Sequence, residues 1–135
     1  RKVGVVFQDF KLLKNKTIYE NVALPLTIRG ETSDSTRTKV MDTLELLGIR
    51  QKHNQYPELI SGGEQQRAAI ARSIIHQPFV LIADEPTGNL DHSFAQEIMK
   101  IVEQICAQGT TVFVATHDTF LIDKYKKRRI EINNG

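Results

Sequence analysis

An uninterrupted apolar run from Phe79 to Ala83, followed at once by Asp84 and Glu85, is the feature that most limits how this chain can fold. Strands of parallel sheets that are covered on both faces have this continuous apolar pattern, so the run predicts such a strand and an α/β fold. Ligands of open α/β sheets bind at the carboxyl ends of the strands. The two acids are therefore expected at the ligand-binding edge of a sheet.

Two acids at the end of a buried strand suit the hydrolysis of a nucleotide. Asp84 can hold Mg²⁺, often through water, while Glu85 orients or deprotonates the attacking water. The alternative is that both acids only mark the point where the strand leaves the core for solvent. The pair by itself does not decide between these interpretations.

The segment Ser61-Gly62-Gly63-Glu64 has the pattern of a capping box and predicts the start of a helix. Two glycines let the backbone approach a ligand closely, and the free amides attract an anion such as phosphate. An ordinary helix cap without a ligand is the alternative. The helix is expected to end before Pro78, with Arg67 and Arg72 solvated or paired locally.

Two further apolar segments, Val3 to Phe7 and Thr111 to Ala115, predict parallel strands. Gln8 follows the first segment, and His117 comes two residues after the second. Because the carboxyl ends of parallel strands meet at one edge, both side chains are expected beside the acidic pair. Taken alone, each is more often a solvated or structural residue, although a glutamine can contact a Mg²⁺-bound water.

A second core helix is expected to begin at Asp91, whose carboxylate can cap it, and to end at Gly109. Its apolar positions recur at helical spacing and are Ile98, Val102 and Ile105. Cys106, the only cysteine, is expected as a buried thiol on this face, and a single cysteine excludes an intrachain disulfide.

The segment between Gln8 and Ser61 is expected to be a small, mostly helical insertion. Thr17 to Glu20 is another capping box, and its helix is expected to stop near Pro25. After a polar linker at residues 30–34, a second helix is expected to bury Val40, Leu44 and Leu47. Gly48 supplies the left-handed residue that ends this helix, and Ile49 the hydrophobic contact that often follows.

Length and composition add modest limits. The 135 residues are 40% hydrophobic, enough for one core, and the net charge of +2 decides little about partners. No apolar run approaches the roughly 20 residues that a membrane-spanning helix needs.

The chain opens on Arg1-Lys2 directly before a strand and stops at Asn133-Asn134-Gly135, so it is expected to be a fragment. The basic run from Lys124 to Arg129 is expected to be a solvated or lipid-facing surface rather than a nucleic-acid site.

Together these segments resemble the motifs of the ATP-binding-cassette (ABC) ATPases, in the family's order and over nearly the whole chain. Ile60 to Arg67 looks like the signature motif, Val80 to Glu85 like the Walker B strand, and Gly88 to Asp91 like the D-loop. Gln8 looks like the Q-loop glutamine, and Thr116-His117-Asp118 like the switch-histidine motif. Ile60 stands where the family usually has Leu, and Glu64 where many members have Gln; neither departure removes a phosphate contact.

The resemblance implies an α/β fold, namely the C-terminal portion of a P-loop ABC ATPase domain with a parallel sheet flanked by helices and a small helical subdomain. Residues 1–135 would be a partial domain that lacks the N-terminal Walker A loop. Residues 9–60 would form approximately the helical subdomain and its connections. Residues 61–135 would form the signature helix and the core with the Walker B, D-loop and H-loop motifs.

ATP and Mg²⁺ are the cofactors that the resemblance implies. Asp84 and Gln8 would hold the metal, and Glu85, His117 and Gln8 would be catalytic. The residues expected to contact the nucleotide are Ser61, Gly62, Gly63, Glu64 and Asp91.

Within the transporter-type group, Glu85 to Asp91 resembles the branch of the cell-division, lipoprotein-release and macrolide-export ATPases, and residues 6–23 look closest to the cell-division type. This likeness implies a motor that dimerises on ATP at the cytoplasmic face of the membrane and drives an FtsX-like integral membrane protein. The short interval between Gln8 and Ser61, without heptads or clustered cysteines, disfavours a nucleic-acid-handling ABC ATPase. A non-catalytic regulatory role rests only on the missing Walker A loop. The fragment alone is expected to be inactive.

Overall fold

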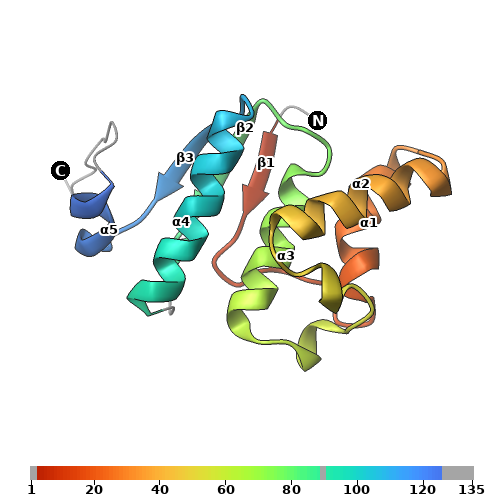
Figure 1. The fold of residues 1–135 in the computed structure, drawn as a ribbon, viewed down its shortest axis with the longest axis horizontal. Coiled ribbons are helices and arrows are strands. Elements are labelled where there is room, and N and C mark those ends of the chain that lie inside the picture. Colours follow the sequence, from red (N-terminus) through yellow and green to blue (C-terminus); the bar gives the residue numbers. More distant parts are fainter. Residues whose placement is uncertain (1–2, 89–90, 126–135) are drawn as a thin grey trace.

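The computed structural model, which describes residues 3–88 and 91–125, contains a three-stranded parallel sheet in the order β1-β2-β3 (Figure 1). The strands are β1 (Val3–Val6), β2 (Val80–Asp84) and β3 (Thr111–Ala115). Val3 pairs with Val80, and Val80 with Thr111, so the three strands are in line and their carboxyl ends lie side by side. The predicted α/β fold is confirmed, and one edge of its sheet collects residues from three distant parts of the sequence.

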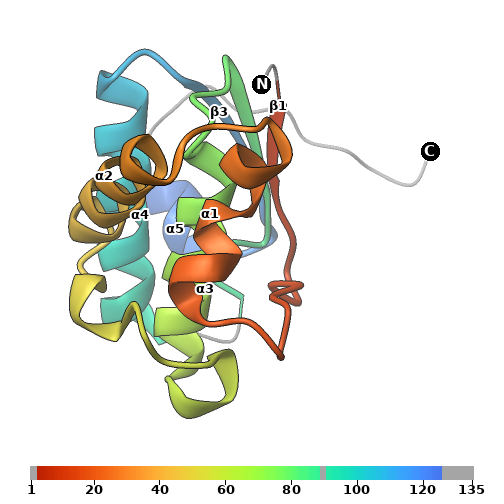
Figure 2. The ribbon, with the colours of Figure 1, turned by 90° about the vertical axis from the view of Figure 1, so that its right-hand side faces the viewer.

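Helices cover one face of this sheet, and Figure 2 shows them gathered on one side of the strands. On the covered face, Leu81 and Ala83 are 1% and 2% exposed. On the opposite face, Ile82 and Phe113 are 40% and 58% exposed. The prediction that β2 is covered on both faces is therefore wrong for the described residues. The strand is apolar on both sides, but the described helices pack against one side only.

The helical layer contains α3 (Gly62–Ile74) and α4 (His92–Ala107), while α5 (Thr119–Lys124) follows β3. Helix α3 packs so closely on β1 that a Cβ atom at Gly4 would collide with the backbone carbonyl of Ser73. Only glycine fits there. Helix α4 connects β2 to β3 as predicted and buries the three apolar positions named above, Ile98, Val102 and Ile105.

Two helices and two short 3-10 turns connect β1 to α3. They are α1 (Ile18–Ile28), α2 (Ser33–Leu46), η1 (Arg50–Lys52) and η2 (Pro57–Leu59). Helix α1 packs against both α2 and α3. The apolar side chains of this region belong to the same core cluster as the sheet, and they include Ile18, Val22, Leu26, Val40, Leu44 and Leu47.

The predicted end of α1 at Pro25 is wrong, because the helix continues to Ile28. A proline inside a helix removes one amide donor and costs about 3 kcal/mol. Leu26, one residue later, is only 1% exposed, and burying a leucine contributes about 1.5 to 3 kcal/mol. Tertiary packing thus offsets much of the local penalty.

The predicted end of α2 is confirmed. Gly48 has a φ of 73°, and its N–H donates to the Glu45 carbonyl at 3.0 Å. The N–H of Ile49 donates to the Leu44 carbonyl at 2.9 Å. These are the two bonds of a Schellman motif, and the buried Ile49 side chain completes it.

Cys106 is exposed, so the prediction of a buried thiol is wrong. It lies in the last turn of α4, at the margin of the apolar face rather than at its centre. Two other expectations lie outside the described residues: the turn at Asn133-Asn134-Gly135, and most of the basic run from Lys124 to Arg129.

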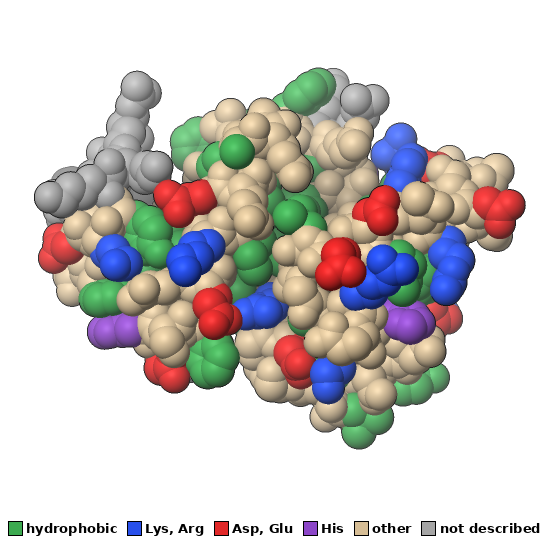
Figure 3. Space-filling model, in the orientation of Figure 1, with side chains coloured by type: hydrophobic (Ala, Val, Ile, Leu, Met, Phe, Trp, Pro, Cys, Tyr) green, Lys and Arg blue, Asp and Glu red, His purple; other side chains and the backbone are tan. Residues whose placement is uncertain are grey.

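Charges of both signs are mixed on the helix-covered face (Figure 3). Opposite charges also pair within the described residues, as Lys39 does with Glu31 at 2.8 Å. Within residues 3–88 and 91–125, no helix is long and apolar enough to cross a membrane.

Candidate functional site

The carboxyl edge of the sheet brings four of the predicted site residues into one region. Gln8 lies two residues beyond β1, Asp84 ends β2, and Glu85 follows it. His117 comes two residues after β3, and the register places Asp84 beside Ala115. Gln8 and Asp84 line one open pocket of about 490 Å³, together with Phe7, Asp9 and Lys11.

The segment after β3 holds the Glu85 carboxylate. Its Oε1 atom lies 2.5 Å from Nδ1 of His117 and accepts a hydrogen bond from the His117 backbone N–H at 2.9 Å. Its Oε2 atom accepts from the Thr116 hydroxyl at 3.1 Å. The Glu85 side chain is 14% exposed, whereas that of His117 is 89% exposed. Both carboxylate oxygens are therefore oriented by neighbours, and the imidazole is open to a ligand from solvent.

The backbone of Glu85 is strained, with a φ of 48°. A non-glycine residue in the left-handed region costs about 1 to 3 kcal/mol and persists only where its surroundings fix it. Here the Glu85 N–H donates to the Ala115 carbonyl at 2.7 Å, and the Glu85 carbonyl accepts from the Gly88 N–H at 3.0 Å. The strand therefore turns sharply at this residue, which directs its carboxylate to the end of β3.

Two overlapping tight turns follow β1, and Gln8 lies in the first of them. The N–H of Phe10 donates to the Phe7 carbonyl at 3.2 Å, which closes a β-turn with Gln8 and Asp9 at its centre. The N–H of Lys11 donates to the Asp9 carbonyl at 2.7 Å, and Phe10 between them has a φ of 64°. These are the features of a classic γ-turn, which is rare and strained. The conformation of the chain around Gln8 is thus narrowly defined.

After these turns the backbone is next held at Leu13, by the side chain of Asn21. The buried side chain of Asn21 accepts from the Leu13 N–H at 2.7 Å and donates to its carbonyl at 3.1 Å. Close packing also limits Gln8 on its other side, because a Cβ atom at Gly88 would lie 3.3 Å from the Gln8 amide nitrogen. Gly88 therefore lies directly beside the Gln8 side chain.

Asp84 and Gln8 offer the oxygen ligands that Mg²⁺ prefers. In the part of the chain that the structure describes, no three His, Cys, Asp or Glu side chains are grouped to hold a metal ion. Mg²⁺ in nucleotide sites commonly takes only one or two protein ligands and completes its shell with phosphate oxygens and water. The pocket therefore fits the cation as part of a metal–nucleotide complex.

The start of α3 forms a separate part of the candidate site. Ser61 Oγ accepts from the Glu64 N–H at 3.1 Å, and Glu64 Oε1 accepts from the Ser61 N–H at 2.9 Å, so the capping box is confirmed. A Cβ atom at Gly62 or Gly63 would meet nothing within 4 Å, so this backbone is open to approach. None of these residues lines the pocket beside Asp84. Within one chain, residues 61–64 therefore do not share the pocket of Gln8 and Asp84.

Asp91 caps α4 as predicted. Its Oδ1 atom accepts from the Phe94 N–H at 3.1 Å and from the Ser93 hydroxyl at 2.8 Å. The Phe94 backbone hydrogen bond, followed by that of the Ser93 hydroxyl, holds the pKa of Asp91 below its ordinary value. Asn89 and Leu90, the middle of the D-loop motif, lie outside the described residues.

The arginines of α3 differ from their prediction. Arg72 was expected to be solvated or locally paired, but its guanidinium donates to the Phe10 carbonyl at 3.1 Å. Arg67 pairs with Glu97 on α4 rather than with a sequence neighbour. Both partners are distant in sequence and so cannot be inferred from helical spacing.

Two polar side chains near the site were not predicted. Gln66 is 1% exposed, and its amide donates to the Pro86 carbonyl in the loop after Glu85. Thr116 orients Glu85, as described above. For Gln66 the sequence did carry a signal, because it stands three and four residues before Ala69 and Ile70 and therefore on a buried face.

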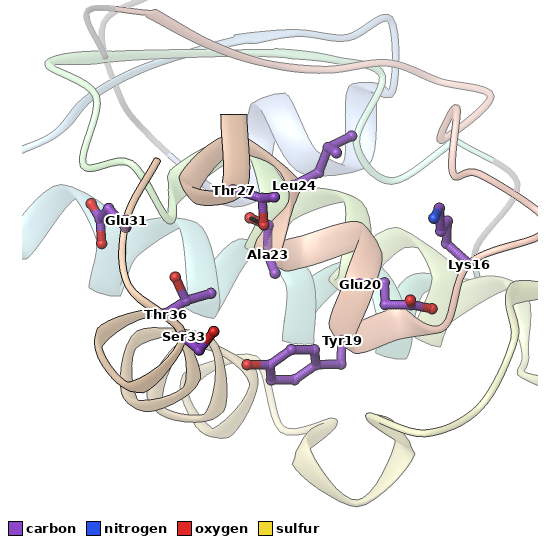
Figure 4. A pocket seen from close by; sticks show the side chains of 9 residues that line it. All are labelled: Lys16, Tyr19, Glu20, Ala23, Leu24, Thr27, Glu31, Ser33 and Thr36. Carbon is purple, nitrogen blue, oxygen red and sulfur yellow. Dashed lines mark hydrogen bonds between the residues drawn. The ribbon is translucent and has the colours of Figure 1, made fainter. Parts of the chain in front are cut away.

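A second pocket, of about 310 Å³, lies between α1 and α2 (Figure 4). The Tyr19 side chain extends from α1 toward Ser33 of α2 (Figure 4). The pocket is lined by Lys16, Tyr19, Glu20, Ala23, Leu24, Thr27, Glu31, Ser33 and Thr36. Its wall mixes apolar, hydroxyl and charged groups.

Comparison with known proteins agrees with this architecture. Residues 1–88, more than half of the chain, match the ABC transporter family. Over all 135 residues the chain is 50% identical to the cell division ATP-binding protein FtsE of Streptococcus pneumoniae (strain D39) and to FtsE of Bacillus subtilis, covering 59% of each. It is 43% identical to FtsE of Escherichia coli K12 and covers 61% of it. The chain thus spans about three fifths of the length of these relatives.

Solved structures give the same result. The dimeric structure of MJ0796, a bacterial ABC transporter cassette, matches 89% of this chain with a TM-score of 0.79 and 36% identity, over 54% of its own length. The post-hydrolysis dimer of MJ0796 bound to ADP and Pi matches equally well in TM-score, at 35% identity. With the family match, the parallel sheet and its strand-edge acids, these likenesses establish that the chain belongs to the ABC transporter family.

Proposed function

We propose that this chain is part of an ATP-hydrolysing motor subunit of an FtsEX-like membrane complex that acts in bacterial cell division. The observation that carries the proposal is the meeting of Glu85 and His117 at the carboxyl edge of the sheet, with Asp84 and Gln8 in the adjoining pocket. The identity of 43–50% to FtsE proteins favours the cell-division role over lipoprotein release or macrolide export.

Each strand-edge residue has a chemical part in this proposal. Bound Mg²⁺ would neutralise charge on the phosphates, with Asp84 and the Gln8 amide as its protein-side ligands, directly or through water. Glu85 polarises the attacking water, because a carboxylate held by three hydrogen-bonding groups is positioned as a general base. His117, exposed beside it, contacts the γ-phosphate and reports its presence.

The signature residues complete the site from a second copy. Ser61, Gly62, Gly63 and Glu64 lie at an open helix start, where backbone amides suit a phosphate. They are outside the strand-edge pocket of their own chain, and the similar MJ0796 cassette is dimeric. We therefore assign them, with Asp91, to nucleotide bound mainly by the partner subunit in an ATP-dependent homodimer.

An FtsX-like integral membrane protein is the proposed partner, with the motor at the cytoplasmic face of the membrane. The docking region that we propose lies beside Gln8, Phe10 and the segment from Thr17 to Leu26. The pocket between α1 and α2 supports this assignment, since it is lined by residues of that segment and offers apolar and polar contacts together (Figure 4).

The test is the rate of ATP hydrolysis by the full-length protein. His117→Ala should lower kcat by at least about 10-fold while ATP binding is retained, because the histidine acts on bound nucleotide. His53→Ala is the matched control: this histidine lies beside η1, and its ring bonds locally to the Arg50 carbonyl. A full-length protein that does not hydrolyse Mg-ATP, or equal losses in the two variants, would overturn the proposal.

A further inference from the structure

A hydrogen bond joins the signature helix to the strained turn beside Gln8. Nη2 of Arg72, near the C-terminal end of α3, donates to the Phe10 carbonyl at 3.1 Å, across 62 positions of sequence. The Arg72 side chain is partly buried, and burial lowers the pKa of its guanidinium. A partly buried charged group needs a hydrogen-bond partner to offset the loss of its hydration, and the Phe10 carbonyl supplies one for Arg72.

The carbonyl that Arg72 binds belongs to a residue with a strained backbone. Phe10 has a φ of 64° and the following Lys11 a φ of 54°. Non-glycine residues rarely adopt either conformation, and two in succession persist only where other contacts fix them. Phe10 also packs its partly buried ring against the main core. The ring and the Arg72 hydrogen bond together hold this pair of residues.

Gln8 depends on the same turn for its direction. It lies in the β-turn that the Phe10 N–H closes on the Phe7 carbonyl. On the N-terminal side the backbone is fixed by pairing of β1 with β2, and on the C-terminal side by the turn at Phe10. If Phe10 relaxes to an ordinary negative φ, the γ-turn from Asp9 to Lys11 opens, and the Phe10 ring and carbonyl no longer anchor the end of the β-turn that contains Gln8. The position of the Gln8 amide beside Asp84 then becomes variable.

We propose that Arg72 is a positioning residue, which holds the turn at Phe10 and thereby sets where the Gln8 amide stands beside Asp84. Its effect on turnover rests on the proposed ATPase function. Among the described residues, Arg72 makes no hydrogen bond to Asp84 or Gln8 and does not line their pocket, so it acts through the backbone of the turn. Because Ser61 begins the same helix, α3 carries both a phosphate-facing end and the support of the Q-loop.

A double-mutant cycle on the full-length ATPase separates positioning from general stability. Arg72→Gln should lower kcat by about 10-fold, the loss expected for one charge-assisted hydrogen bond, with KM for ATP within about 2-fold of wild type. Arg72→Lys keeps a charged donor and should recover most of the loss. In a Gln8→Ala background, Arg72→Gln should have no further effect, because the residue that it positions is gone.

Equal effects of Arg72→Gln in both backgrounds would overturn the proposal, since they indicate a structural role independent of Gln8. An unchanged kcat in the wild-type background would also overturn it. Full activity of Gln8→Ala alone would instead contradict the proposed role of Gln8. The positioning role of Arg72 is then tested by a measurement that does not depend on turnover.

That measurement is trypsin cleavage of the folded full-length protein after Lys11, an exposed residue inside the strained segment. Arg72→Gln should raise the cleavage rate by at least about 5-fold, because the turn opens more often. Arg50→Gln is the matched control: it removes an exposed arginine that pairs with Glu45 at 3.7 Å and should leave the rate unchanged. Unchanged cleavage in Arg72→Gln refutes the inference, and Arg72→Lys should cleave like wild type.

Discussion

The Nδ1 atom of His117 lies 2.5 Å from Oε1 of Glu85, although 32 positions separate the two residues in sequence. The contact exists because Glu85, directly after the last residue of β2, has a left-handed backbone, while β3 ends at Ala115, level with Asp84. A carboxylate held in this way is oriented before any ligand arrives. Preorganisation of that kind is what a general base requires.

Glu85→Gln in the full-length protein should therefore lower kcat by at least about 100-fold, because the amide cannot take a proton from water. ATP should still bind, so an ATP-bound dimer should accumulate. Single-turnover kinetics and gel filtration with ATP measure the two effects. Glu45→Gln, an exposed α2 residue paired with Arg50, is the control and should behave as wild type. Near-normal turnover of Glu85→Gln would show that another group activates the water.

Ser61→Arg should abolish hydrolysis without unfolding the protein, because a large cation then occupies the open helix start. Thr38→Arg, at an exposed position of α2, adds the same side chain without touching either site. The sharper measurement mixes Ser61→Arg subunits with subunits that carry a Walker A mutation. If the signature residues act on the partner's nucleotide, the mixed dimers regain one working site. Failure of every mixture to hydrolyse ATP would contradict the arrangement in trans.

Cysteines at Leu24 or Thr27, in the pocket between α1 and α2, should crosslink to a cytoplasmic loop of the FtsX-like partner. Cys106 must first be replaced by serine, since the native thiol is exposed. Crosslinked products are measured in membranes that contain both proteins. A cysteine at Lys124 serves as the control, and crosslinks at that position alone would move the interface to the other end of the molecule.

The 135-residue chain by itself should bind Mg-ATP poorly, because its sequence contains no Gly-Lys-Ser/Thr phosphate loop. An exposed helix start contributes about 0.3 to 1 kcal/mol to anion binding, whereas micromolar affinity needs about 8 kcal/mol. The open sheet face, with Phe113 58% exposed, should also cause self-association. Calorimetry and sedimentation measure both, and a monomer with a micromolar dissociation constant would refute this expectation.

The Asp91 cap should make a contribution to stability that disappears in acid. Its pKa is lowered from 3.8 in the folded protein, so the ionised form stabilises the fold above that pH. As the pH falls through the lower folded value, the contribution is lost. Asp91→Asn keeps a neutral cap, so its Tm deficit relative to wild type should shrink below about pH 4. Melting curves of both full-length proteins between pH 3 and 7 measure this difference, and a deficit that does not change with pH would contradict it.

Helix starts and ends could be predicted from the sequence where contacts between near neighbours in the chain determine them. The capping box at Ser61 and the left-handed Gly48 each depend on contacts within five residues, and both were predicted correctly. The grouping of Gln8, Asp84 and His117 also followed, since parallel strands in line present their ends together. These inferences needed no knowledge of packing.

Features that depend on distant contacts could not be derived in the same way. Pro25 remains inside α1 because Leu26 is buried by the core, and spacing alone does not measure that burial. Arg72 and Gln66 bond to loops that are 62 and 20 positions away. The apolar run in β2 correctly indicates that both faces of the strand are apolar. It does not show that the described helices cover only one of them.

Because glycine has no side chain, Gly4 lets α3 pivot on the sheet. It leaves the last turn of α3 in backbone contact with β1 at Ser73, whereas a Cβ atom at Gly62 in the first turn would meet nothing within 4 Å. The 13 residues of this helix span about 20 Å. A tilt of about 10° with Gly4 as the pivot would therefore move the Ser61 end by roughly 3 Å while Ser73 stays in place. A small rotation at the sheet thus becomes a displacement the size of one hydrogen bond at the N-terminal end of the helix.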